Sequence, residues 1–319
     1  MAETIKTVGS AGADYTSYTA WEADITADPV DDQTAKGLLA EVITDTVAIS
    51  FSNTNLVAVK ITSDVSHSGR YSAGHVIHNT AGNGNFSISQ PGTTTIENVG
   101  LTKTNAGAAS AIVNVTASNG AVVVQRCTIK TTNSNASRCM RITTGVGGAS
   151  ITVRNCALVD VGASSNDWNI CSGGALTFQN CTFLSVSGTR DSQVDAFAGT
   201  TTITNCAFFK LAGATVTDDV LGAPTADRNA TWSASTFGTN CLTNKVATDL
   251  LDSVNTPYDL HWASGATMLG YVGTNLSGTF TTDIDGETRT AWYMGADYIY
   301  VAPSNGGGRG LRVGMRLGL

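Results

Sequence analysis

Charged residues are scarce in this chain. Asp, Glu, Lys and Arg together make up 13% of the 319 residues, against roughly a quarter in ordinary soluble domains. The formal net charge is −7, so the chain lacks the positive field that a general nucleic-acid-binding surface needs. We therefore expect no nucleic acid among its partners.

Long apolar runs are also missing. The sequence contains no stretch of about 18 consecutive apolar residues, the length that a membrane-spanning helix needs. The first residues, Met1 to Lys6, have neither the basic start nor the apolar core of a secretory signal. We expect no membrane partner and synthesis in the cytoplasm.

Short motifs that carry known chemistry are absent as well. The sequence has no Gly-x-Ser-x-Gly, no phosphate-binding loop and no Cys-x-x-Cys. His75 and His78 flank one apolar run, but a metal site would want a third ligand at a defined spacing. We expect no cofactor and no metal.

In place of these features, one short phrase recurs. An apolar, Thr-rich run leads to Asn, then usually Cys, and an apolar residue follows the Cys position by two. With Asn or Arg as the register mark, positions 98, 126, 155, 180 and 205 give steps of 28, 29, 25 and 25 residues. A repeat of this length predicts a solenoid of stacked coils. The copies are Thr94–Asn98, Val123–Cys127, Ile151–Cys156, Leu176–Cys181 and Thr202–Cys206.

Each clear repeat holds three short β-type runs, which predicts three parallel sheets and seven or eight coils up to about residue 245. Asn between the first two runs suits a one-residue turn, since Asn tolerates the left-handed conformation. Cysteines in one register would stack about 4.8 Å apart with parallel side chains. We therefore expect a ladder of reduced, buried thiols. Its members are Cys127, Cys156, Cys181 and Cys206.

The two ends depart from the repeat. Ser17 is a candidate N-cap, and Tyr18, Trp21 and Ile25 share one face of a short helix that should end before Pro29. Such a helix would cover the open end of the first coil. The expected regions are an N-terminal lead and capping helix (1–37), parallel β-helix coils (38–245), a closing region (246–302), and a Gly hinge with a β arm (303–319).

The Asn-Cys-x-Phe/Leu phrase resembles the right-handed parallel β-helix family, often called pectin-lyase-like, over about residues 9 to 298. The lead at 9–21 looks like the Gly-Asp-Tyr lead and capping helix of such domains. Asp283-Ile284-Asp285-Gly286 with Arg289, followed by Gly295-Ala296-Asp297-Tyr298, looks like their C-terminal closing motif. The resemblance implies an all-β, three-sheet solenoid. We interpret the closing motif as a turn plus cap rather than a metal site, because a calcium loop of the EF-hand kind would need further oxygen ligands.

The last residues form a separate pattern. Gly306 to Gly308 make a flexible hinge, and apolar residues then alternate with Arg or Gly from Leu311 to Leu319. A strict period of two predicts a strand with one apolar face, which could add to the exposed sheet edge of a partner. The candidate partner-binding residues are Arg309, Leu311, Arg312, Val313, Met315, Arg316 and Leu317.

An enzyme is the alternative. Members of the family that cleave polysaccharides use clustered acids, and glycoside hydrolysis needs two carboxyl groups roughly 5 to 9.5 Å apart. Acids are few in the clear repeats, and only Asp167 lies at an offset similar to those of Asp191 and Asp195 in the next coil. These three are the catalytic candidates, and solvated turns are their simpler interpretation.

Together these features favour a structural protein over an enzyme. We expect a bacteriophage virion protein, a capsid decoration or cement protein anchored through its C-terminal arm to the major capsid protein or another virion protein. Tailspikes of this fold usually carry a separate N-terminal virion-binding domain, whereas the capping helix here begins by about Thr16. A polysaccharide lyase or hydrolase, or a tailspike, is the other reading, and the sequence leaves homo-oligomerisation open.

Overall fold

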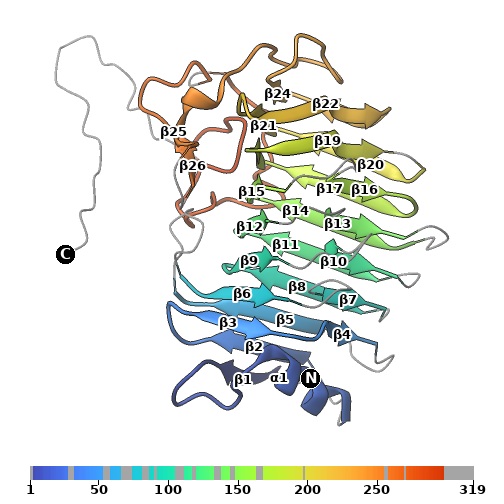
Figure 1. The fold of residues 1–319 in the computed structure, drawn as a ribbon, viewed down its shortest axis with the longest axis vertical. Coiled ribbons are helices and arrows are strands. Elements are labelled where there is room, and N and C mark those ends of the chain that lie inside the picture. The colour runs from blue at the N-terminus through green and yellow to red at the C-terminus, as the bar shows by residue number, and fades with distance from the viewer. Residues whose placement is uncertain are drawn as a thin grey trace.

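Three parallel sheets wind around one apolar core in the computed structural model, which forms a right-handed β-solenoid of about seven turns (Figure 1). This confirms the predicted fold class. The structure describes residues 3–27, 32–52, 58–65, 74–80, 86–89, 92–104, 111–116, 120–132, 138–143, 148–162, 168–196, 198–254, 258–268 and 271–297.

Each coil contributes one strand to each sheet, in chain order along the stack. Sheet A contains β1 (Glu3–Val8), β2 (Asp32–Gly37), β5 (Ala58–Ser63), β8 (Thr93–Glu97), β11 (Ala121–Gln125), β14 (Ser150–Arg154), β17 (Ala175–Gln179), β20 (Thr200–Thr204) and β23 (Thr225–Asp227). Sheet B contains β3 (Val42–Asp45), β6 (Val76–Asn79), β9 (Gly100–Lys103), β12 (Thr128–Thr131), β15 (Ala157–Asp160), β18 (Thr182–Ser185), β21 (Ala207–Lys210) and β24 (Ala230–Thr231). Sheet C contains β4 (Ile49–Phe51), β7 (Phe86–Ile88), β10 (Ala111–Val115), β13 (Arg138–Ile142), β16 (Asn169–Cys171), β19 (Gly188–Ala196) and β22 (Ala214–Gly222).

The repeat phrase forms the strands of sheet A and the turns that follow them. Val124, Val153 and Phe178 occupy equivalent positions in β11, β14 and β17 and are buried in the core. The intervening Thr and Gln side chains face outward and are half-buried. Burial with a period of two therefore sets which face of each strand meets the core.

The left-handed backbone predicted for these turns is confirmed, but each turn has two residues instead of one. The first of the two residues between the sheet A and sheet B strands has left-handed backbone in five successive coils, a conformation that Asn reaches more easily than most residues. The φ values are 54° at Asn98, 50° at Arg126, 49° at Asn155, 50° at Asn180 and 56° at Asn205.

The predicted thiol ladder is also confirmed. All seven cysteines are free, and the four at the repeat position are fully buried. The backbone N–H of Cys127 donates to Cys156 Sγ over 3.4 Å. Burial raises the pKa of Cys127 and Cys156 well above its ordinary value, so these thiols pack as small hydrophobes.

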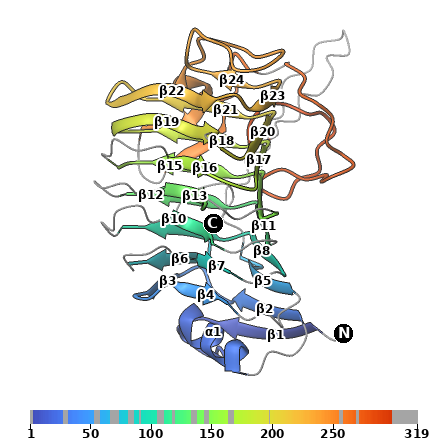
Figure 2. The same ribbon diagram turned by 90° about the vertical axis from the view of Figure 1, so that its right-hand side faces the viewer.

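Helix α1 (Tyr18–Ala27) covers the first coil, as predicted (Figure 2). Ser17 Oγ accepts the N–H of Ala20 over 3.1 Å, which is an N-cap contact. Tyr18 and Trp21 are fully buried, and Trp21 meets Phe51 edge to face. Strands β1 and β2 pair in parallel beside the helix, so sheet A extends into the N-terminal region that was expected to hold only a lead and a helix. The sequence did not predict β1 because residues Thr4 to Val8 alternate only weakly in polarity. Among the described residues, no helix has the length and apolarity of a membrane span.

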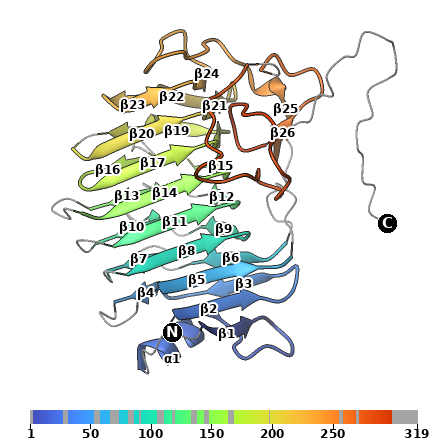
Figure 3. The same ribbon diagram turned by 180° about the vertical axis from the view of Figure 1, so that it is seen from behind.

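After β24 the chain leaves the solenoid and turns back along its side. A short 3₁₀ helix, η1 (Ala247–Asp249), leads into the antiparallel pair β25 (Leu250–Asp252) and β26 (Asp259–Trp262). These strands and residues 271–297, together called the closing segment, cover the outer face of sheet B near β15, β18 and β21 (Figure 3). The apolar residues that meet there include Val159, Leu184, Phe209, Leu260, Trp262 and Met294.

Candidate functional site

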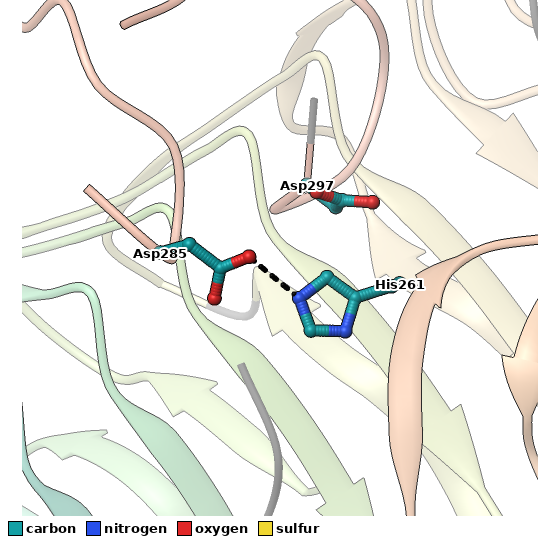
Figure 4. Close-up of side chains that lie close together, drawn as sticks. All are labelled: His261, Asp285 and Asp297. Atoms are coloured by element: carbon teal, nitrogen blue, oxygen red, sulfur yellow. Dashed lines mark hydrogen bonds and ion pairs between the residues drawn. The ribbon is translucent and has the colours of Figure 1, made fainter. Parts of the chain in front are cut away.

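The closing segment gathers an imidazole and several carboxylates. His261 lies on β26, Asp285 lies in the turn at 283–287, and Asp297 lies at the end of the described chain (Figure 4). One ligand atom from each of the three side chains lies within 4.8 Å of the other two. Three segments that are distant in sequence therefore converge at one point.

Strand β26 orients His261. Leu260 and Trp262 pack toward sheet B, and the Trp262 ring meets Phe209 edge to face with ring centroids 5.9 Å apart. Because side chains alternate along a strand, Asp259 and His261 face the other side. The packing of Leu260 and Trp262 against sheet B thus fixes the positions of Asp259 and His261 on the opposite face of β26.

The turn that carries Asp285 is held by Asp283. Asp283 Oδ1 accepts the N–H groups of Asp285 (3.0 Å) and Glu287 (2.8 Å). Gly286 at the tip has φ 84°, which only glycine adopts without strain. This turn is the structure expected for the first half of the closing motif.

Arg289 ties this turn to the solenoid. Its buried guanidinium donates to the carbonyls of Thr282 and Asp297, each over 3.3 Å, and to Asn155 Oδ1 over 3.2 Å. One planar group with five N–H donors can serve several acceptors at once. Arg289 therefore joins the two parts of the closing motif and fastens them to the solenoid.

His261 is hydrogen-bonded at both ring nitrogens. Its Nδ1 contacts Asp259 Oδ1, and its Nε2 lies 2.9 Å from Asp285 Oδ2. Burial opposes the charged ring, but the bonds to Asp259 and Asp285 outweigh it and raise the pKa of His261 to about 11. Without another cation the ring is an imidazolium between two carboxylates.

Asp283 is the unusual member of the group. Its side chain is fully buried, and its Oδ2 has no hydrogen-bond partner. Desolvation, followed by the charges of Asp285 and Asp297, raises the pKa of Asp283 to about 7. Arg289 and the bond from the Glu287 N–H oppose this rise, but Asp283 Oδ2 itself has no hydrogen-bond donor.

The structure describes two of the three catalytic candidates from the sequence, both on β19. Asp191 is exposed on β19, whereas Asp195 is buried on the same strand, and Asp167 lies outside the described residues. The candidate partner-binding residues, from Arg309 to Leu317, also lie outside the described residues.

The sequence indicated three of the five residues that meet here. The closing motif drew attention to Asp283, Asp285 and Asp297, but not to Asp259 or His261. The only available signal was Asp259-Leu260-His261-Trp262 itself, in which polar residues alternate with apolar ones. That pattern marks a half-buried strand and leaves open what its polar face meets.

Comparison of the chain with protein-family models and with the curated proteins finds no match.

Proposed function

We propose that the protein is a structural component of a bacteriophage virion, a rigid solenoid that decorates the capsid. Its anchor is the C-terminal arm, with Arg309 to Leu317 as the partner-binding residues and the major capsid protein or another virion protein as the partner. Kinship with the pectin-lyase-like family is part of this proposal, and the three parallel sheets with left-handed Asn turns support it.

The observation that carries the proposal is the attachment of residues 295–297 to the solenoid. The N–H of Ala296 donates to Thr182 Oγ1 on β18 over 3.0 Å, and the N–H of Gly295 donates to the carbonyl of Asn205 over 2.7 Å. Asp297 is therefore fixed beside the solenoid, and a rigid body held in this way up to Asp297 supports a role as a structural module.

The outer face of sheet A supports a structural role over polysaccharide cleavage. Among the described residues of β8, β11, β14, β17 and β20, Glu97 is the single carboxylate. Its Oε1 lies 2.6 Å from Lys60 Nζ, and Gln125 Nε2 donates to its other oxygen. A carboxylate held by these partners, on five strands that carry no second acid, does not form a general acid and nucleophile pair.

The test is binding of the full-length protein to purified phage heads that lack it. Leu311→Asp with Val313→Asp places two charges on the apolar face of the arm, and we expect binding to fall at least tenfold. Gly310→Asp with Gly318→Asp adds the same charge away from that face and serves as the matched control. Equal binding by both variants and the wild type would reject the arm as the anchor.

The enzymatic alternative has its own measurement. Intact protein is incubated with a panel of bacterial polysaccharides, and new reducing ends or unsaturated products are measured. Cleavage that disappears in Asp191→Asn or Asp195→Asn would replace the structural proposal with a lyase or hydrolase. We expect no product above that of the heat-denatured protein.

A further inference from the structure

The group around His261 has the dimensions of a metal-ion site. Nitrogen and carboxylate ligands lie about 2.0–2.2 Å from a bound transition metal, so neighbouring ligands are about 3 Å apart. His261 Nε2 and Asp285 Oδ2 are 2.9 Å apart, and the ligand atoms of His261, Asp285 and Asp297 all lie within 4.8 Å of one another (Figure 4). Small side-chain rotations would bring all three to one ion.

The imidazole is already oriented for such a role. Asp259 engages Nδ1, which leaves Nε2 directed at Asp285. Histidine ligands of metals commonly contact a carboxylate through the second ring nitrogen, which fixes the ring and increases its basicity. Asp259 is thus a positioning residue, and Nε2 is the ligand.

Asp283 provides an independent observation. Its Oδ2 is a fully buried carboxylate oxygen without a hydrogen-bond partner, in the turn that presents Asp285. Such an oxygen is costly to bury without compensation. Two cationic side chains, His261 and Arg289, lie among four carboxylates. The group therefore has an excess of negative charge that a divalent cation would balance. The four are Asp259, Asp283, Asp285 and Asp297.

The site also has an entrance. The side chains of His261 and Asp285 are 17% and 26% exposed, whereas Asp297 and Asp283 are buried behind them. An ion can therefore arrive from solvent and meet its buried ligand from one side.

We propose that His261, Asp285 and Asp297 bind one divalent transition-metal cation, and that the ion fixes the closing segment. The mixed nitrogen and oxygen set suits Zn²⁺ and its neighbours, while Mg²⁺ and Ca²⁺ prefer sites made of oxygen alone. The ion joins β26, the turn at 283–287 and the segment that precedes the arm.

The test is calorimetric titration of chelator-treated, full-length protein with Zn²⁺, Mg²⁺ and Ca²⁺ in separate runs. We expect one Zn²⁺ per chain, affinity for Zn²⁺ at least tenfold above that for the other two ions, and a higher unfolding temperature with Zn²⁺. Absence of Zn²⁺ binding would overturn the proposal, and His261 would then be only the counter-charge of its carboxylates.

Matched variants locate the ion. His261→Gln and Asp285→Asn keep size and hydrogen-bonding capacity, and each should weaken Zn²⁺ binding at least tenfold. His78→Gln and Cys241→Ser remove other potential Zn²⁺ ligands and should leave the affinity unchanged. The reverse pattern would assign the ion to those residues and reject this site.

A measurement on the wild type removes the dependence on variant folding. Co²⁺ replaces Zn²⁺, and its absorption spectrum distinguishes nitrogen and oxygen ligands from thiolates. A spectrum without thiolate charge-transfer bands is expected, and intense bands of that kind would place the metal on cysteine instead.

Discussion

The left-handed asparagines serve two purposes at the scale of single residues. Each turns the chain from sheet A to sheet B, and three of them also bind the closing segment. The Nδ2 groups of Asn155, Asn180 and Asn205 donate to the carbonyls of Thr282 (2.7 Å), Tyr293 (2.8 Å) and Thr274 (2.7 Å). A backbone requirement and a packing requirement therefore coincide at one residue type.

Two substitutions at Asn155 separate these purposes. Asn155→Gly keeps the left-handed turn but removes the contacts to Thr282 and Arg289, which should cost about 1–3 kcal/mol. Asn155→Ala loses the same contacts and adds about 1 kcal/mol of backbone strain. The shift of the urea unfolding midpoint measures both. Equal midpoints for the two variants would contradict the strain at this turn.

His75 is a buried neutral histidine under the capping helix. Its Nδ1 lies 3.0 Å from the carbonyl of Leu39, which can only accept, so Nδ1 carries the proton. Nε2 then accepts from the Tyr18 hydroxyl over 2.8 Å. Burial lowers the pKa of His75, although the Leu39 carbonyl and Glu41 oppose this shift.

The lowered pKa predicts a loss of stability on mild acidification. Below pH of about 6.5 the unfolded chain takes up a proton at this histidine, whereas the folded protein does so only at lower pH. The free energy of unfolding should therefore fall as pH drops below about 6.5. Melting temperatures from pH 7.5 to 5.5 check this, and His75→Gln should flatten the curve. Burial also lowers the pKa of His78, so His78→Gln measures how much that histidine contributes to the pH dependence. A pH dependence of the melting temperature that stays unchanged in His75→Gln would reject the assignment to His75.

At the scale of elements, α1 is a separate unit that seals one end. Trp21 fills the space between the helix and Phe51, and both side chains are fully buried. In a solenoid each coil contacts only its neighbours, so damage at one end stays local.

Trp21→Ala should therefore loosen the first coils alone. The cavity costs about 3–5 kcal/mol, and hydrogen exchange of β1 to β4 should accelerate at least tenfold. Exchange of β14 to β20 should stay as in the wild type. Trp232→Ala at the other end of the stack is the matched control and should leave β1 to β4 unchanged. Faster exchange throughout the chain would show that the solenoid unfolds as one unit.

Elements also show how much could be read from the sequence. The repeat phrase predicts strands, turns and the thiol ladder because each depends on residues within one coil or at one register position. The capping helix follows from Ser17 and the Tyr18, Trp21 and Ile25 face for the same reason. The site at His261 depends on a contact with Asp285 across 24 residues, in the region where the period fails. No local pattern there specifies which segments meet.

At the scale of the molecule, the closing segment shields an apolar stripe on the outside of the solenoid. Val159, Leu184 and Phe209 would otherwise face solvent from three adjacent coils. An exposed stripe of this kind on stacked strands promotes self-association.

Leu260→Asp should expose that stripe. Leu260 is 3% exposed within the same cluster, and a buried carboxylate there costs several kcal/mol. We expect increased binding of a hydrophobic dye and a concentration-dependent rise in mass by light scattering. Leu251→Asp adds the same charge at a position that is 56% exposed on the same hairpin and should behave as the wild type. Dye binding equal to wild type in Leu260→Asp would contradict the shielding role.

The contacts from Asn155 to Asn205 that hold the closing segment divide the solenoid into two parts. A coil cannot be added or removed between Asn155 and Asn205 without misaligning these contacts. The coils before β11 make none of them. Duplication of one early coil would lengthen the body by about 4.8 Å and leave the closing segment where it is. The distance between the capped end and the closing segment can thus change in steps of one strand spacing.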